Sequence, residues 1–443
     1  MPEVSCLMEP VKLQPYSHQV GGSNSVLSLN ETTLCKPLNP REHYFYLNMP
    51  EDLKQFTPEY RGLIEVKLQE DSDGYITYIG YLSKSPDHQK SPVSSLSSSP
   101  VPSQWSPSQT SSQGSSPSCS HRSSPESSSS DPDSPVLFGD KNKAEETERN
   151  NTSIRLLRSG SVEVSTQTGT IYHTLDHGKS GKTSAVNPWT VKCQKRLISK
   201  MKNIDKDSQR CKFILLENVA AKFQNPCVLD IKMGTRQHGD DVSEEKKQRF
   251  MKRCQTSTSS IIGTRLCGMQ VYQANTGKYI CHNKYYGRSL TLEGFKQTLY
   301  QFLHNGCELR SDVIDAIIQR LQKLSRVVTE QDTFRFYSSS LLLMYEGHQS
   351  QYDNKLGQSS LSNGPSKEDN CNCDINQKRD NQCHGYNRSE NCLIDVRMID
   401  FAHSTHVGIK DEKTVHNGPD TGYLFGLQHL TELFSQIKTE GCV

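Results

Sequence analysis

The chain has 443 residues and a formal net charge of +2, so it has no general attraction to nucleic acids or anionic membranes. Only 33% of the residues are hydrophobic and the mean hydropathy is −0.70, which predicts long polar segments beside a smaller core. No run of 18 apolar residues occurs, so we expect no transmembrane segment. We also expect no nucleic-acid partner, and any anion-binding site must be local.

The N-terminus, residues 1–15, carries acidic side chains and no apolar stretch typical of a signal peptide. This predicts a cytoplasmic and/or nuclear protein, in which the 15 cysteines are free thiols. An alternative is a zinc site at Cys371, Cys373, Cys383 and Cys392. The Cys-x-Cys spacing and the polar surroundings fit a structural zinc site poorly.

Two shifts in composition divide the chain. Ser and Pro dominate the start of 85–185, and Asn, Gln and Ser dominate 349–391, so we predict that both segments are disordered insertions. The ordered blocks that remain are 8–84, 186–348 and 392–443. They contain enough residues for one bilobal domain or two small lobes.

Several serines in the first insertion precede proline, among them Ser91, Ser99, Ser106, Ser116, Ser124 and Ser134. They are candidate phosphorylation or docking sites for protein partners. The alternative is a solvated linker with no partner.

In the first block, Gly21-Gly22 lies in a stretch, Gln19–Leu29, that predicts a glycine turn between strands. The next predicted strand, Thr32–Lys36, ends on a lysine, and Glu42 follows. A strand lysine held by a glutamate can position ATP phosphates, and glycine amides can approach them. The alternatives are an ordinary turn and a surface ion pair.

In the second block, Lys212–Val219 is a predicted strand, and Cys227–Ile231 is another. Asp230 and Lys232 are two residues apart, so on an extended strand both side chains point to one face. A carboxylate beside an ammonium can bind and steady a transferring phosphoryl group. A strand-end ion pair is the alternative.

Ser243–Cys254 predicts a helix with Ser243 as its N-cap and two glutamates in its first turn. Lys246, Arg249, Lys252 and Arg253 fall on one arc of that helix, a surface suited to a compact polyanion. The alternatives are a solvated basic face and a nuclear-import signal.

Later segments complete the predicted secondary structure. Apolar periodicity predicts helices at Thr291–His304, Ser311–Val328 and Tyr423–Ile437. Phe336–Tyr345 and Leu393–Phe401 are predicted strands. The pattern indicates an α+β, kinase-like arrangement.

At the ends of the last two predicted strands, Asp400 and the hydroxyls of 338–340 supply oxygen atoms of the kind that Mg²⁺ prefers. A capping aspartate and a polar strand edge are the alternatives.

Five segments resemble one family. Pro226–Gly234 resembles the Pro-x-x-x-Asp-x-Lys-x-Gly signature of the inositol polyphosphate kinases. His18–Gly22, Met233–Asp241, Phe336–Leu342 and Ile399–His403 are similar to segments of its hexakisphosphate kinase branch. The resemblance implies an α+β, bilobal fold of the protein-kinase and ATP-grasp type.

The resemblance also implies an ATP-dependent phosphotransferase that uses Mg²⁺. It would convert inositol hexakisphosphate into a diphosphoinositol pentakisphosphate, with inositol pentakisphosphate as a second substrate. One alternative is a kinase that phosphorylates a hydroxyl of a lower inositol phosphate. Another is a scaffold protein with a weak or inactive kinase core.

Roles for single residues follow from the same resemblance. Asp230 and Lys232 are the implied catalytic pair, and Asp400 and Ser340 the implied metal ligands. The implied ATP contacts are Lys36, Glu217, Asn218, Val219, Asp230 and Asp400. The implied substrate contacts are Pro226, Cys227, Val228, Leu229, Lys232, Met233, Gly234, Lys246, Lys247, Lys252, Arg253 and His403.

Overall fold

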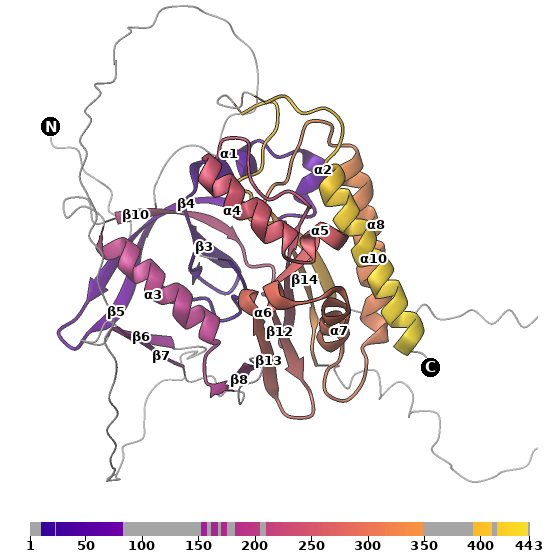
Figure 1. Ribbon diagram of the computed structural model, residues 1–443. Helices are drawn as coiled ribbons and strands as arrows, with labels where there is room; N and C mark the ends of the chain where they lie inside the picture. Colours follow the sequence, from indigo (N-terminus) through magenta and orange to yellow (C-terminus); the bar gives the residue numbers. More distant parts are fainter. Residues whose placement is uncertain are drawn as a thin grey trace, which may run out of the picture. The chain divides into compact units, whose positions relative to one another are not determined.

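Alternate side chains are buried along Thr33–Pro37, the pattern of a strand with one face on a core. Pro226–Met233 is buried at every position except Lys232, as expected of a central strand. These two strands belong to different β-sheets, and helices cover both sheets (Figure 1). The computed structural model describes residues 10–22, 24–82, 152–156, 161–166, 170–174, 182–203, 210–348, 393–409 and 414–441.

The first sheet has eight strands. In spatial order they are β1 (Val11–Pro15), β2 (Leu27–Ser28), β3 (Thr33–Pro37), β10 (Arg210–Glu217), β4 (Tyr60–Glu70), β5 (Tyr75–Leu82), β6 (Thr152–Leu156) and β7 (Val162–Thr166). Because β1 also pairs with β5, the strands from β1 to β5 and β10 form a closed ring. Closure leaves these six strands without free edges.

The second sheet has seven strands. In spatial order they are β15 (Ile394–Ile399), β14 (Ser340–Glu346), β11 (Pro226–Met233), β12 (Thr264–Gln273), β13 (Lys278–Asn283), β8 (Ile171–Thr174) and β9 (Lys182–Ser184). All neighbours are antiparallel except β13 and β8. The chain passes from the first sheet to the second between β10 and β11, so this connection is a hinge between two lobes.

Nine helices are described: α1 (Pro40–Leu47), α2 (Glu51–Lys54), α3 (Pro188–Lys202), α4 (Glu244–Gln255), α5 (Ser259–Ile262), α6 (Lys284–Ser289), α7 (Leu292–Leu303), α8 (Ser311–Thr329) and α10 (Thr421–Gly441). The helices α7, α8 and α10 contact the second sheet and share its apolar core. The helix α3 buries Leu197, Ile198 and Met201 in the core of the first sheet. None of the helices within the described ranges is long and apolar enough to cross a membrane.

The α+β fold is confirmed, and the expected helices correspond to α4, α7, α8 and α10. The expected strands correspond to β3, β10, β11, β14 and β15. Within 85–185, where the sequence predicts an insertion, the structure contains the short strands β6 to β9. The strand β6 pairs with β5 and β7, and β8 pairs with β13 and β9. Local periodicity does not reveal such pairings between separate segments. The rest of that segment and all of 349–391 lie outside the described residues.

Candidate active site

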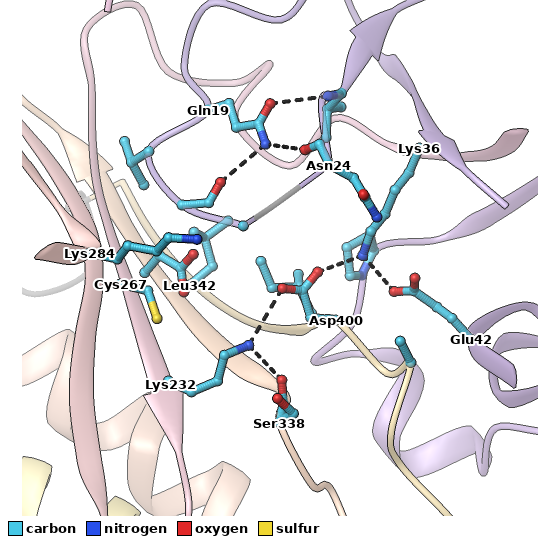
Figure 2. Close-up of a pocket in the computed structure, with 18 of the residues that line it drawn as sticks. Gln19, Asn24, Lys36, Glu42, Lys232, Cys267, Lys284, Ser338, Leu342 and Asp400 are labelled. Carbon is cyan, nitrogen blue, oxygen red and sulfur yellow. Dashed lines mark hydrogen bonds and ion pairs between the residues drawn. The ribbon is translucent and has the colours of Figure 1, made fainter. Parts of the chain in front are cut away.

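A cavity of about 400 Å³ is lined by residues of both sheets and of the hinge (Figure 2). Its lining includes the glycine turn, Lys36 of β3, Asp230 and Lys232 of β11, the helix α4 and the residues after β15. The cavity therefore brings together most of the segments that the sequence predicts to be functional. Its mixture of an apolar end and a charged end suits a ligand with an apolar ring and an anionic tail.

The apolar end lies beside the hinge. Val20, Val219, Val228 and Met344 pack in one buried cluster, and all of them line the cavity. The N–H of Val219 has no hydrogen-bond partner among the described residues. An apolar slot with a free backbone donor is the arrangement that a purine base requires.

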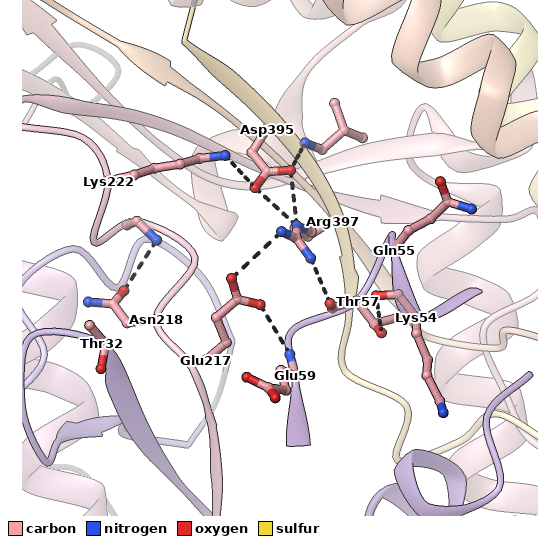
Figure 3. Close-up of polar contacts among 12 residues, drawn as sticks. Thr32, Lys54, Gln55, Thr57, Glu59, Glu217, Asn218, Lys222, Asp395 and Arg397 are labelled. Atoms are coloured by element: carbon pink, nitrogen blue, oxygen red, sulfur yellow. Dashed lines mark hydrogen bonds and ion pairs between the residues drawn. The ribbon is translucent and has the colours of Figure 1, made fainter. Parts of the chain in front are cut away.

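Side chains of β15 hold the hinge in place (Figure 3). Arg397 of β15 donates from Nε to both carboxylate oxygens of Asp395 at 3.0 Å and from a terminal nitrogen to the carbonyl of Thr57 at 2.8 Å. The same guanidinium lies 3.7 Å from Oε1 of Glu217. Lys222 adds a 2.9 Å contact to Asp395. The hinge is therefore tied to the strand that ends at the charged end of the cavity.

The glycine turn covers part of the cavity. Gly22 has a φ of +78°, a conformation that a glycine adopts without strain. Gln19 donates from Nε2 to the carbonyls of Gly21 and Asn24 at 3.1 and 2.6 Å, and it accepts from the Val26 N–H at 3.0 Å. These bonds fix the turn across the mouth of the charged end.

A three-residue ionic contact forms the charged end. Nζ of Lys36 lies 2.6 Å from Oε1 of Glu42 and 2.5 Å from Oδ1 of Asp400. Burial alone would lower the pKa of Lys36, but Asp400 and Glu42 raise it well above its usual value. Burial would raise the pKa of Asp400, but Lys36 and Lys232 lower it far below its usual value. Both groups therefore stay charged at neutral pH.

Lys232 occupies the opposite side of Asp400. Its Nζ donates to the carbonyl of Ser338 at 2.5 Å and lies 3.6 Å from Oδ2 of Asp400. Both Ser338 and Asp400 have a positive φ, +59° and +68°. Such backbone strain costs about 1–3 kcal/mol per residue and collects at functional sites. The carbonyl of Ser338 and the carboxylate of Asp400 both face the ammonium of Lys232.

Asp230 lies on the same face of β11 and is only 3% exposed. Its Oδ1 has no hydrogen-bond partner among the described residues. Burial raises its pKa from 3.8 to about 6, although the positive charge of Lys232 opposes that shift. The site therefore holds one carboxylate with a strongly lowered pKa and one with a raised pKa.

The oxygen atoms present fit a hard cation. Asp400 offers carboxylate oxygens at the cavity surface, and Mg²⁺ bound to nucleotide phosphates takes only one or two protein carboxylates. No cluster of three or more His, Cys, Asp or Glu side chains that could hold a metal by itself occurs in the described part of the chain. Ser340 is fully buried behind the cavity lining, and its hydroxyl has no hydrogen-bond partner there.

The helix α4 forms a further wall. Ser243 caps it and accepts from the Lys246 N–H, as the sequence predicts. Phe250 and Arg253 line the cavity, and Nζ of Lys246 lies 3.4 Å from Nε2 of His403. Burial, and then Lys246, lower the pKa of His403 to about 4, so this imidazole is neutral at pH 7.

Comparisons with known proteins place this arrangement in a family. A model of the family described as inositol polyphosphate kinase matches residues 213–435. The chain is 41% identical to inositol hexakisphosphate kinase 1 of Rattus norvegicus, over 97% of this chain and 94% of the relative. This chain belongs to the inositol polyphosphate kinase family. Within it, the chain belongs to the hexakisphosphate kinases, so the expected fold and the expected ATP-dependent phosphotransferase class are confirmed.

Other relatives agree. Identity is 38% to inositol hexakisphosphate kinase 2 and 36% to inositol hexakisphosphate kinase 3 of Homo sapiens, each over 97% of this chain and 96% of the relative. A solved structure, the inositol phosphate multikinase of S. cerevisiae in complex with ADP and Mn²⁺, is 24% identical. It aligns with a TM-score of 0.38 over 51% of this chain and 84% of its own.

Some of the predicted site residues do not line the cavity. Cys227, Leu229 and Met233 are fully buried in the core of the second sheet, because their side chains point away from the face that carries Asp230 and Lys232. Pro226 and Gly234 flank that run and do not line the cavity either, whereas Val228 does. The Pro-x-x-x-Asp-x-Lys-x-Gly run thus combines a packing face and a site face.

The basic helix divides in the same way. Lys246 and Arg253 lie on the side of α4 that faces the site, whereas Lys252 is exposed and Lys247 lies 3.4 Å from Oε2 of Glu244. Glu217 and Val219 line the cavity. Asn218 instead donates to the carbonyl of Glu31 at 2.7 Å, which stabilises the hinge.

Several lining residues had no role assigned from the sequence. Arg265, Lys284 and Arg288 contribute to the cavity, and so do His18 and Gln237, which lie in two segments of the family resemblance. Lys284 and Arg288 lie on α6, which is too short to show a helical period. The run Lys284–Arg288, basic and aromatic, is the only local signal that could have drawn attention to them.

The eight described cysteines form no disulfide. This agrees with the prediction of free thiols for that part of the chain. The four cysteines of the alternative zinc site and the six named Ser-Pro sites lie outside the described residues.

Proposed function

We propose that this kinase transfers the γ-phosphoryl group of ATP to inositol hexakisphosphate and forms a diphosphoinositol pentakisphosphate. Inositol pentakisphosphate is a second substrate. One observation carries the proposal. Lys36 and Lys232 both contact Asp400 at one end of the cavity, and the basic face of α4 forms the adjacent wall. The relatives named hexakisphosphate kinases support the same substrate.

The adenine of ATP would lie in the apolar end against Val219, whose N–H is free to donate to the base. The phosphates would then extend under the glycine turn toward Lys36. This lysine is positioned by Glu42 in the manner of a kinase strand lysine. The other implied hinge contact, Glu217, acts through its backbone, because its side chain is engaged with the Glu59 N–H and Arg397.

Asp400 would hold Mg²⁺ together with nucleotide oxygens. When bound, Mg²⁺ neutralises the charge on the transferring phosphoryl group. Ser340 would need a local rearrangement to reach the metal, so we assign it to the support of Lys232, its partner residue across the β11–β14 pair. Asp400→Asn should raise the Mg²⁺ concentration needed for half-maximal activity, measured by titration of activity with Mg²⁺.

Lys232 would steady the phosphoryl group between donor and acceptor. The acceptor has no free hydroxyl, so a phosphate oxygen attacks the γ-phosphorus while its bond to the ADP oxygen breaks. An ionised phosphate oxygen carries no proton to remove. Asp230 therefore acts in positioning, beneath the glycine turn, rather than as a general base.

A lower inositol phosphate is the second candidate. The observation that favours this second candidate is the pKa of Asp230, which is raised to about 6. A carboxylate with such a pKa suits a general base that accepts the proton of an inositol hydroxyl. Inositol hexakisphosphate and a trisphosphate should be offered side by side with labelled ATP in a single-turnover assay. Label in a product of the hexakisphosphate alone supports the first candidate, and label in the trisphosphate alone supports the second.

Lys232→Ala is the control in this assay. It should fold normally and lose at least about 100-fold in turnover, the usual effect of removing a group that stabilises transition-state charge. A near-normal rate would remove Lys232 from its assigned role. Cytoplasmic and/or nuclear placement, and partners of the Ser-Pro sites, remain predictions that imaging of a tagged chain and affinity capture would test.

A further inference from the structure

The charge of the proposed acceptor exceeds the cations assigned so far. A phosphomonoester carries about −1.5 to −2 charges at pH 7, so six of them carry about −9 to −12. Lys232, Lys246 and Arg253 supply three positive charges, and His403 is neutral. The cavity needs more cations than the segments with a predicted role provide.

A second group of cations lies beside the cavity, on the helices α3 and α6. Lys284 and Arg288 line the cavity, and Lys192 and Arg196 lie next to them on α3. In Figure 2, Lys284 projects from the side opposite Lys36 and Glu42. We call these four residues the α3–α6 cluster.

Aromatic rings hold the cluster in place. Nζ of Lys192 lies 4.5 Å from the ring centroid of Tyr285 and donates to its hydroxyl at 3.2 Å. Nζ of Lys284 lies 4.9 Å from the ring centroid of Trp189, and the guanidinium of Arg288 lies 5.5 Å from that of Tyr285. Such contacts orient cations without neutralising them. The indole of Trp189 also donates to the Gly21 carbonyl at 3.0 Å, so the cluster is attached to the glycine turn.

No carboxylate of the described residues forms an ion pair with the cluster. Within the described residues, Lys192, Arg196, Lys284 and Arg288 form no ion pair, whereas Lys296, Arg236 and Lys438 elsewhere each do. Burial lowers the pKa of Lys284, and Arg196 and Arg288 lower it further. Burial and then Arg288 also lower the pKa of Arg253 across the cavity on α4. Like charges gathered without a counter-ion favour an anionic ligand that they share.

We infer that the α3–α6 cluster is a second phosphate subsite, which faces Arg253 of α4 and receives the phosphates of the inositol ring remote from the reacting one. It selects the fully phosphorylated ring, because a lower inositol phosphate places fewer phosphates on it. This inference rests on the proposed function and names the part of the cavity that sets its substrate preference. Aromatic-supported lysines and arginines suit phosphates, which accept both point and fork donors.

The test compares Lys284→Met and Arg196→Glu with Lys195→Met, an exposed cation on the same α3 that takes no part in the cluster. Direct titration of inositol hexakisphosphate into each protein without ATP gives Kd. Steady-state assays give KM for ATP and for each inositol phosphate, and a thermal melt checks folding. Lys284→Arg should restore most of the affinity that Lys284→Met loses.

We expect Kd and KM for the hexakisphosphate to rise about tenfold or more in both cluster variants, the usual effect of losing a charge-assisted contact. KM for ATP, and KM for a trisphosphate, should change less than about threefold, and Lys195→Met should resemble the unaltered chain. An equal rise for ATP or for the trisphosphate would overturn the subsite, as would no rise at all. If Lys284→Met fails to fold, the Kd and KM of Arg196→Glu, a change at an exposed position, test the subsite. Failure of the unaltered chain to bind the hexakisphosphate would instead refute the proposed function.

Discussion

Gly21 lies so close to Asp230 that a Cβ atom at position 21 would stand 1.8 Å from Oδ2 of the aspartate. The glycine turn therefore rests directly on β11, the strand that carries the proposed catalytic pair. Because Trp189 and Gln19 bond the carbonyl of Gly21, the turn cannot move away without losing those contacts. A side chain at position 21 would therefore displace either the turn or the Asp230 carboxylate.

From this contact we predict that Gly21→Ala lowers kcat/KM by about 10- to 100-fold, since shifts near 1 Å in catalytic geometry cost that much. Steady-state kinetics of a double-mutant cycle will measure the effect. In the background of Asp230→Ala, which removes the clashing oxygen, Gly21→Ala should cost much less. Strictly additive losses would contradict a direct contact between the two positions.

The buried carboxyl of Asp230 should reduce stability at neutral pH. Its pKa rises from 3.8 to about 6 on folding, so the folded chain binds more protons than the unfolded one between these values. The stability contribution of Asp230 is then fully present below about pH 4 and is lost as pH rises through 6. Two pKa units correspond to about 3 kcal/mol at pH 7.

Asp230→Asn should therefore raise the free energy of unfolding at pH 7 by up to about 3 kcal/mol while activity falls. Denaturant melts of both proteins at pH 7 and at pH 4 will show this. The difference in stability should shrink toward zero at pH 4. A variant that is less stable at pH 7, or a difference that does not depend on pH, would disprove the assignment.

The basic face of α4 should bind the inositol phosphate rather than ATP. We predict that Lys246→Glu together with Arg253→Glu raises KM for the inositol phosphate by about 100-fold or more, because two attractive contacts become repulsive. KM for ATP should change little. The control is Gln248→Glu, which adds negative charge to an exposed position of the same helix. Equal effects on both substrates would indicate a structural role for the helix.

Two cations beside the hinge, Arg397 and Lys222, contact the carboxylate of Asp395. Arg397 should contribute more to the free energy of unfolding than Lys222. Asp395 is 3% exposed, and Arg397 contacts both of its oxygens. Arg397→Met leaves that buried carboxylate poorly paired and should cost about 3 kcal/mol. It should also raise KM for ATP, since Glu217 in the hinge loses a neighbour.

Lys222→Met is the matched change, because the Lys222 side chain is 40% exposed and contacts the same carboxylate. It should cost less than about 1 kcal/mol. Chemical denaturation followed by fluorescence will compare the two. Equal costs would mean that Arg397 does not dominate the network.

Local sequence patterns predicted the elements whose burial is regular along the chain. Examples are α8, whose Val313, Ile317, Leu321 and Leu324 recur at helical spacing, and β11, which is buried almost throughout. The closed ring of the first sheet depends on the pairing of β1 with β5. That pairing joins segments about 70 residues apart in sequence, which no local pattern encodes.

The site likewise contains some residues that local patterns predicted and others that they did not. Asp230 and Lys232 share a strand, so their common face followed from spacing alone. Lys36 and Asp400 are 364 residues apart, so no spacing in the sequence could show that their side chains are in contact. The α3–α6 cluster was not predicted either, because it forms only when Trp189 and Tyr285 of different helices bring their neighbouring cations together.

The most direct test of the account is a ³¹P NMR spectrum of the product made by the purified chain from inositol hexakisphosphate, ATP and Mg²⁺. Pyrophosphate formation predicts a pair of mutually coupled phosphorus signals on the inositol product and the loss of one phosphomonoester signal. A spectrum that holds only phosphomonoester signals, with ADP formed from a lower inositol phosphate instead, would contradict transfer to a phosphate oxygen. It would return Asp230 to the role of a general base.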